Sequence, residues 1–182
     1  MKCSTLYLQL HQINLGKVMS ETAEGWHRVL TAFDDWIEYE TSEFGPWTSY
    51  FSLETLRGLT TNETINWIQK MQEDIIPGRI EKCQDAGVAL EDFLPYMPDP
   101  KARDTVQSMI DLNSLLQDYM LGMSDIFTTM IEEFKAGGLE EIEGHLSSLA
   151  ESEEEIRHHM SLYSQGFGKL RSLGLEMPDE ME

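Results

Sequence analysis

The sequence predicts an all-α protein that folds as a mostly antiparallel bundle of about five helices. Apolar side chains recur at helical spacing along most of the chain, most clearly over residues 102–135, which contain no proline and a single glycine. The Gly137-Gly138 pair then favours a tight turn before another periodic stretch, so we expect a C-terminal helical hairpin. We expect one domain over residues 1–175 and an acidic flexible tail over residues 176–182.

The long helix expected over residues 102–135 organises the bundle. The apolar positions that fill one arc of its projection are Val106, Met109, Ile110, Leu112, Leu116, Tyr119, Met120, Met123, Phe127, Met130, Ile131 and Phe134. An acidic series projects to the opposite side, namely Asp104, Asp111, Asp118, Asp125 and Glu132. This helix would span roughly 50 Å at its usual rise, and an apolar face of that length needs several neighbouring helices to cover it.

Three polar residues, Asn113, Gln117 and Ser124, lie at the edge of the apolar arc of this helix. They indicate either a pairing between helices that requires a fixed register or the rim of a groove. The sequence leaves both interpretations open.

Two helices are expected in the N-terminal part. Residues 1–18 either form a first amphipathic helix or precede a natural start at Met19. Ser20 is suited to cap a second helix that runs to about Ser42, and Gly45-Pro46 should end it. Its expected buried stripe consists of Ala23, Trp26, Leu30, Phe33 and Ile37, flanked by Val29 and Trp36.

In the middle of the chain we expect a short helix over residues 52–57 and a longer helix that begins at Thr61. Pro77-Gly78 should kink or break the longer helix. The proline-rich stretch 87–101 should be partly extended. The last helix, from Leu139 to about Leu173, should be weakened by three glycines, Gly144, Gly166 and Gly168.

The charge balance is strongly acidic, with 33 acidic against 13 basic residues and a formal net charge of −20. Such a field repels phosphate backbones and anionic lipid surfaces, so we expect neither direct nucleic-acid binding nor membrane binding. It fits solubility, a basic protein partner, mimicry of nucleic-acid charge or adaptation to high salt. The two cysteines, Cys3 and Cys83, form no disulfide framework, which favours the reducing cytoplasm.

The motif that most suggests metal chemistry is Glu-x-x-His, which occurs as Glu24/His27 and as Glu155/His158. Two such pairs that point inward in a helical bundle can hold a di-metal centre. In a helical projection, however, all four residues lie away from the apolar stripes of their helices. We find no phosphate-binding loop and no nucleophile with a neighbouring base, so no catalytic residue and no cofactor are predicted.

Four aromatic residues cluster in the segment that follows the second helix: Phe44, Trp47, Tyr50 and Phe51. Aromatic side chains are favoured anchors at protein interfaces, because they bury a large area at a small cost in entropy. An aromatic loop can equally cover the open end of a bundle. These four are the candidate partner-binding residues.

The absence of a catalytic constellation favours a non-enzymatic protein that acts through protein–protein interaction, as an adaptor, a chaperone or a regulatory subunit. The first alternative is a metal-dependent enzyme that uses the two Glu-x-x-His pairs. The second is an acidic decoy, with Asp111, Asp118, Asp125 and Glu132 in place of phosphates, although their spacing of about 10.5 Å is wider than the phosphate step along one strand. Association with a second copy of the chain would also cover a long apolar face.

Overall fold

The structure is a computed structural model that describes residues 3–97 and 99–175, with side chains from residue 21 onward. The helical elements in chain order are α1 (Cys3–Tyr39), a π-helix (Glu40–Phe44), a 3₁₀ helix (Gly45–Tyr50), α2 (Leu53–Leu56), α3 (Thr61–Lys70), a π-helix (Met71–Ile75), α4 (Ile76–Phe93), a 3₁₀ helix (Leu94–Tyr96), α5 (Pro100–Gly137) and α6 (Leu139–Ser172). The all-α prediction is confirmed. The predicted acidic tail, 176–182, lies outside the described residues.

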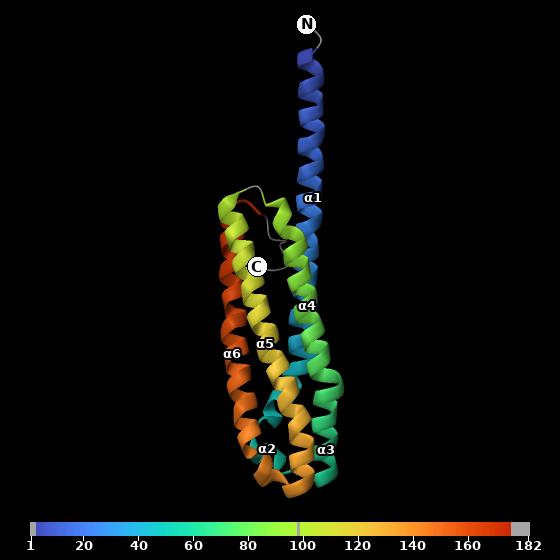
Figure 1. The fold of residues 1–182 in the computed structure, drawn as a ribbon, viewed down its shortest axis with the longest axis vertical. Helices are drawn as coiled ribbons and strands as arrows, with labels where there is room; N and C mark the ends of the chain where they lie inside the picture. Colours follow the sequence, from blue (N-terminus) through green and yellow to red (C-terminus); the bar gives the residue numbers. More distant parts are fainter. Residues whose placement is uncertain (1–2, 98, 176–182) are drawn as a thin grey trace.

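The long helices lie side by side as an antiparallel bundle (Figure 1). The backbone of α4 packs between those of α1 and α5, and α6 packs against α5. The α5–α6 pair is the predicted hairpin. Its turn is confirmed at Gly138, whose φ of +77° lies in the left-handed region that glycine adopts at low cost.

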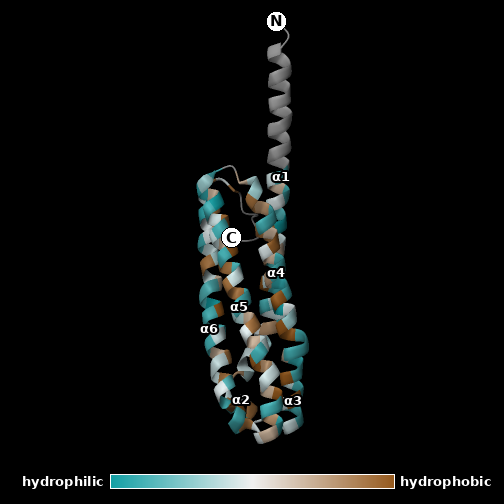
Figure 2. Cartoon of the chain, in the orientation of Figure 1, coloured by the Kyte–Doolittle hydropathy of each residue, from teal (hydrophilic) through white to brown (hydrophobic). Residues whose placement is uncertain are grey.

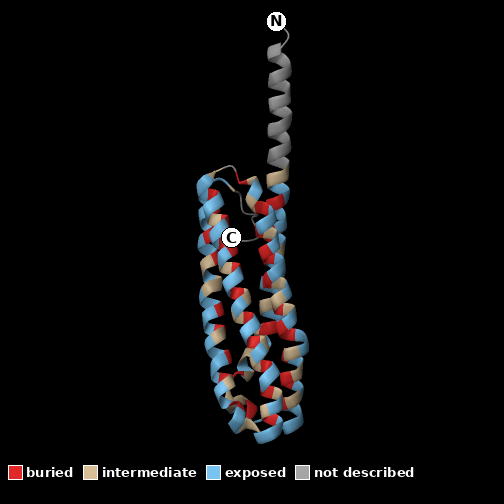
Figure 3. Cartoon of the chain, viewed as in Figure 1, coloured by how far each residue is buried: buried red, intermediate tan, exposed pale blue. Residues whose placement is uncertain are grey.

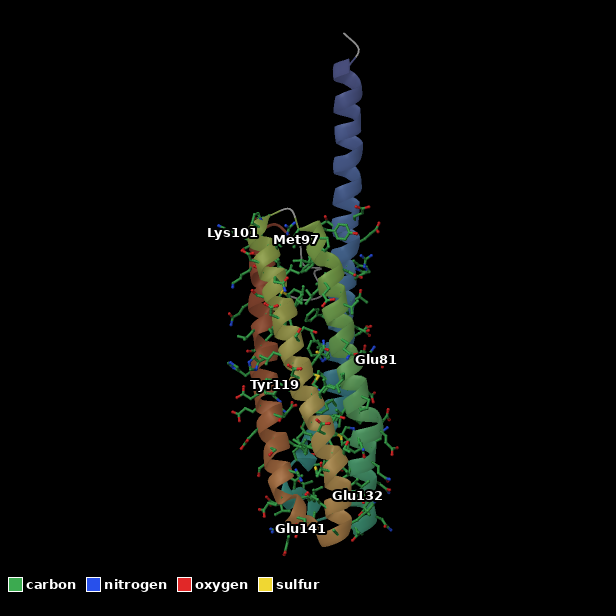
Figure 4. The ribbon with its side chains drawn as sticks, viewed as in Figure 1. Glu81, Met97, Lys101, Tyr119, Glu132 and Glu141 are labelled. Carbon is green, nitrogen blue, oxygen red and sulfur yellow. The ribbon has the colours of Figure 1, made fainter. Side chains whose placement is uncertain are left out.

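The prediction for the central helix is confirmed in α5. Its apolar arc faces the neighbouring helices, and Leu116, Met120 and Phe127 are fully buried. The acids of the opposite series are all exposed, and the buried residues lie on the inward faces of the bundle (Figures 2 and 3). Side chains of acids such as Glu81 and Glu132 lie on the outside of the bundle (Figure 4).

The start predicted for the second helix is wrong, and its predicted buried stripe is confirmed only in part, at Trp26, Leu30 and Phe33. No helix begins at Ser20, because α1 runs without interruption from Cys3 to Tyr39. Ala23 is exposed and Ile37 is 47% exposed. The buried face of α1 is turned instead toward Val29 and Trp36, both fully buried, since this helix must cover both α4 and the aromatic side chains of α6.

The partly extended stretch predicted over residues 87–101 is much shorter than expected. The helix α4 continues to Phe93 and a 3₁₀ turn follows, so among the described residues of this stretch the backbone is extended at Met97 and Asp99. Gly87 does not end a helix. It lies buried where α4 crosses α5, and a Cβ at this position would collide with the carboxamide of Asn113. Its role is close packing of two backbones.

The break expected at Pro77-Gly78 is a change of helix type. A π-helix over Met71–Ile75 connects α3 to α4, and Pro77 follows in the first turn of α4, where its missing N–H costs least. The Tyr39 hydroxyl donates to the carbonyl of Ile75 at 2.9 Å. Gly78 leaves room for this ring, since a Cβ there would overlap it.

The first turn of α3 is held by a capping box. The Thr60 hydroxyl accepts from the backbone N–H of Glu63 at 3.3 Å, and the Glu63 carboxylate accepts from the backbone N–H of Thr60 at 2.7 Å. The Thr60 hydroxyl also donates to the Glu63 carboxylate at 2.7 Å, and the two bonds that this carboxylate accepts, from the Thr60 backbone N–H and hydroxyl, lower the pKa of Glu63. The box therefore fixes Glu63 near the aromatic segment.

We expect Thr60→Ala to lower the free energy of unfolding by about 1 kcal/mol, because it leaves a helix N-terminus uncapped. Urea unfolding measures this, with Thr61→Ala, at an exposed neighbour in the same turn, as the control. The deficit should shrink as the pH falls through the lowered pKa of Glu63, since protonation of Glu63 weakens the bond that its carboxylate accepts from the Thr60 hydroxyl, a bond that only the wild type makes. Equal losses in the two variants would contradict the assigned cap.

Candidate partner-binding site

The two Glu-x-x-His pairs do not come together. Glu24, His27, Glu155 and His158 are exposed, on α1 and α6. Within residues 3–97 and 99–175, no group of three or more His, Cys, Asp and Glu side chains is placed to hold a metal ion. The four residues thus form no shared site in this structure.

The four aromatic candidates divide into two kinds. Phe44 and Phe51 are buried in the core, at 1% and 8% exposure, and their rings contact each other at 6.2 Å between centroids. Trp47 and Tyr50 are half-buried and lie in the surface layer. Only this second pair presents ring area that another molecule can contact.

Trp47 and Tyr50 form one wall of a pocket of about 440 Å³, which we call the aromatic pocket. The 3₁₀ helix Gly45–Tyr50 brings them against α3, where the Tyr50 ring stacks on Trp67 with centroids 5.9 Å apart. The ring centroids of Trp47 and Tyr50 lie 5.7 Å apart. The remaining lining residues are Leu59, Glu63, Asn66 and Lys70.

Trp67 joins the aromatic pocket to the hydrophobic core. Its ring packs edge-on against Phe127 of α5 at 5.6 Å, and the residue is only 3% exposed. Its indole nitrogen is buried and has no hydrogen-bond acceptor within the part of the chain that the structure describes. A buried N–H without an acceptor costs about 1–3 kcal/mol, so a ligand oxygen that reached this donor would relieve a real penalty.

The charges around the aromatic pocket are unequal. Lys70 is engaged by Asp74 one turn further along, whereas Glu63 lies on the rim at a position set by the capping box. Aromatic faces attract cations, and the net charge of −20 adds to that preference. The pocket is therefore suited to a group that is both apolar and positively charged.

The most densely connected polar group lies deeper, in the core. The Arg79 side chain of α4 is fully buried and binds both carboxylate oxygens of Glu40, at 2.6 and 2.8 Å. It also donates to Glu153 of α6 at 2.8 Å and stacks over the Phe44 ring at 3.6 Å. Burial alone would lower the pKa of Arg79, but the two carboxylates outweigh it and raise that pKa.

This arrangement, the Arg79 cluster, serves structure. The Arg157 side chain donates its Nε–H to the other carboxylate oxygen of Glu153, with the nitrogen and oxygen 2.8 Å apart. The Trp36 indole N–H donates to the Glu40 carboxylate at 3.0 Å. Both carboxylates are thus satisfied inside the bundle. Sequence reasoning missed the cluster, although one signal was present: Glu153 falls on the apolar stripe of α6, between Leu149 and Ile156.

A second buried polar group explains one of the residues at the edge of the α5 arc. Asn113 donates to the backbone carbonyl of Cys83 at 2.8 Å and accepts from Gln117 at 2.6 Å, so it fixes the register of α4 on α5. Burial raises the pKa of the Cys83 thiol to about 12, which keeps it protonated at neutral pH and unsuited to nucleophilic chemistry. Burial likewise raises the pKa of Tyr163.

Comparison of the chain with protein-family models, with curated proteins and with solved structures finds no match. The fold itself defines the class of the protein, which is an all-α antiparallel helical bundle. None of its helices, over the described residues, has the length and apolarity needed to cross a membrane.

Proposed function

We propose that this protein is a non-enzymatic interaction protein, and that its aromatic pocket receives a peptide segment of a basic protein partner. The observation that carries the proposal is the Trp67 indole N–H, which is buried without an acceptor among the described residues and belongs to a side chain that lines the pocket. A peptide backbone offers carbonyl oxygens, the acceptor this donor requires.

The surroundings of the pocket support a basic segment. The faces of Trp47 and Tyr50 can hold the apolar stem and charged end of a lysine or arginine side chain, and Glu63 stands on the rim. The strong negative charge of the chain would accelerate the approach of such a partner and make the association rate depend on salt. The proposal places both proteins in the cytoplasm, in keeping with the free Cys83 thiol.

The proposal is tested with capped tetrapeptides that differ at one position, which carries lysine, arginine, leucine or glutamate. Binding is followed by NMR through the indole N–H signals, and Trp67→Phe identifies the signal of Trp67. The lysine and arginine peptides should shift the Trp67 indole signal, because a carbonyl accepts its proton, and the glutamate peptide should not. A Trp67 signal that none of the peptides moves would overturn the proposal.

We expect Trp47→Ala and Tyr50→Ala each to weaken binding of the lysine peptide about tenfold, the effect of removing an aromatic anchor worth about 1.4 kcal/mol. Leu121→Ala is the matched control, since Leu121 is an apolar side chain of α5, 48% exposed and outside the pocket. Equal affinity of Trp47→Ala, Tyr50→Ala and Leu121→Ala for the peptide would contradict this assignment. Light scattering on the same samples distinguishes a foreign partner from a second copy of the chain.

A further inference from the structure

The seam between α1 and α6 is bridged by aromatic rings. Phe33 of α1 meets Tyr163 and Phe167 of α6 edge-on, at 4.8 and 5.0 Å between centroids, and Trp36 meets Tyr163 at 5.9 Å. The α5–α6 and α1–α4 pairs have their backbones in close contact instead. Rings of this size hold two helices apart and leave space beside them.

That space is a cleft of about 370 Å³, the α1–α6 cleft, within the usual range for sites of small apolar ligands. Its lining is Phe33, Trp36, Ile37, Met160, Tyr163, Ser164, Phe167, Gly168 and Arg171. Ile37 is 47% exposed at its rim, an apolar side chain that a ligand in the cleft would cover. The cleft is a separate set of residues from the aromatic pocket.

The charge of the lining selects the kind of ligand. Of the described residues that line the cleft, Arg171 alone is charged, in a chain with 33 acidic and 13 basic residues. It stands in the last turn of α6, where the helix C-terminus favours a cation. The polar groups of the lining are the Arg171 guanidinium and the hydroxyls of Tyr163 and Ser164, and the Ser164 hydroxyl already donates to the carbonyl of Ser161 at 2.7 Å. An apolar cleft with a single guanidinium complements a molecule with an aliphatic chain and one anionic head.

We propose that the α1–α6 cleft binds a single-chain aliphatic carboxylate. The chain lies against Phe33 and Phe167, and the carboxylate accepts hydrogen bonds from Arg171. This ligand function is additional to peptide binding at the aromatic pocket and does not depend on it.

The test is isothermal titration of the full chain with dodecanoate below its micellar concentration, beside dodecanol and dodecyltrimethylammonium, which share its chain length. We expect one dodecanoate per chain, weaker binding of dodecanol, and weakest binding of the cationic amphiphile. Absence of dodecanoate binding, or tighter binding of the cation, would overturn the proposal.

Two variants locate the ligand. A Cβ at Gly168 meets open space, so Gly168→Leu should fold while its side chain enters the cleft and lowers dodecanoate affinity about tenfold or more. Gly144→Leu is the matched control, at another α6 glycine with open space and outside the cleft. Arg171→Gln should weaken dodecanoate up to about fivefold and leave dodecanol unchanged, with Lys169→Gln as its control. Unchanged dodecanoate affinity in Gly168→Leu would place the ligand elsewhere.

Discussion

Arg79→Met is expected to lower the free energy of unfolding by about 3–5 kcal/mol, the largest effect of any single substitution proposed for this chain. Arg79 is fully buried and neutralises two carboxylates, Glu40 and Glu153, that are themselves largely buried. Methionine fills part of the same volume but leaves Glu40 without its ion pair. An uncompensated charge in a low-dielectric interior is the reason for the large penalty.

Urea unfolding followed by circular dichroism measures the loss. The control is Arg57→Met, which removes an arginine from an exposed position and should change stability by no more than about 0.5 kcal/mol. The triple variant Arg79→Met, Glu40→Gln, Glu153→Gln should recover most of the loss, since the charges leave together and the carboxamide that replaces the Glu40 carboxylate still offers an acceptor to the Trp36 indole. Failure of the triple variant to recover would show that Arg79 acts through packing and not through charge.

Gly87→Ala is expected to lower the free energy of unfolding by about 1–3 kcal/mol, although alanine is the better helix former. The added methyl group would collide with the Asn113 carboxamide. That group cannot turn away at low cost, because Cys83 holds its nitrogen and Gln117 its oxygen. Gly144→Ala, in open space on α6, should instead stabilise by about 0.5–1 kcal/mol.

A double-mutant cycle tests the cause of the Gly87 effect. In an Asn113→Ala background the obstacle is gone, so Gly87→Ala should become neutral or stabilising. A change of sign between the two backgrounds would locate the penalty at the contact between α4 and α5. The same loss in both backgrounds would contradict that origin.

The helices that sequence reasoning described best are those with a wide apolar face. The buried positions of α5 and the Gly138 turn follow from spacing and from glycine alone, because a helix of 38 residues repeats its pattern many times. Its start at Pro100, in contrast, lay inside the stretch 87–101, which was expected to be partly extended. Proline is tolerated at the first position of a helix, so the same residue can mark either outcome.

The aromatic segment shows where local pattern is insufficient. Phe44, Trp47, Tyr50 and Phe51 are all large aromatic residues of one short segment, yet two are core residues and two remain half-buried beside α3. The difference depends on where Trp67 and Phe127 arrive from other parts of the chain. No property of the segment itself contains that information.

The sequence by itself determined the helical class, the C-terminal hairpin and the solvent-exposed acidic face of α5. The reason is that apolar periodicity, glycine conformation and the placement of charge are properties of a single helix and its turn. Tertiary structure alone decided which polar groups lie inside. Arg79 meets Glu40 across 39 residues of chain and Glu153 across 74. The pairing of buried charges depends on the rotation and register of whole helices, which are set by the packing of all their neighbours at once.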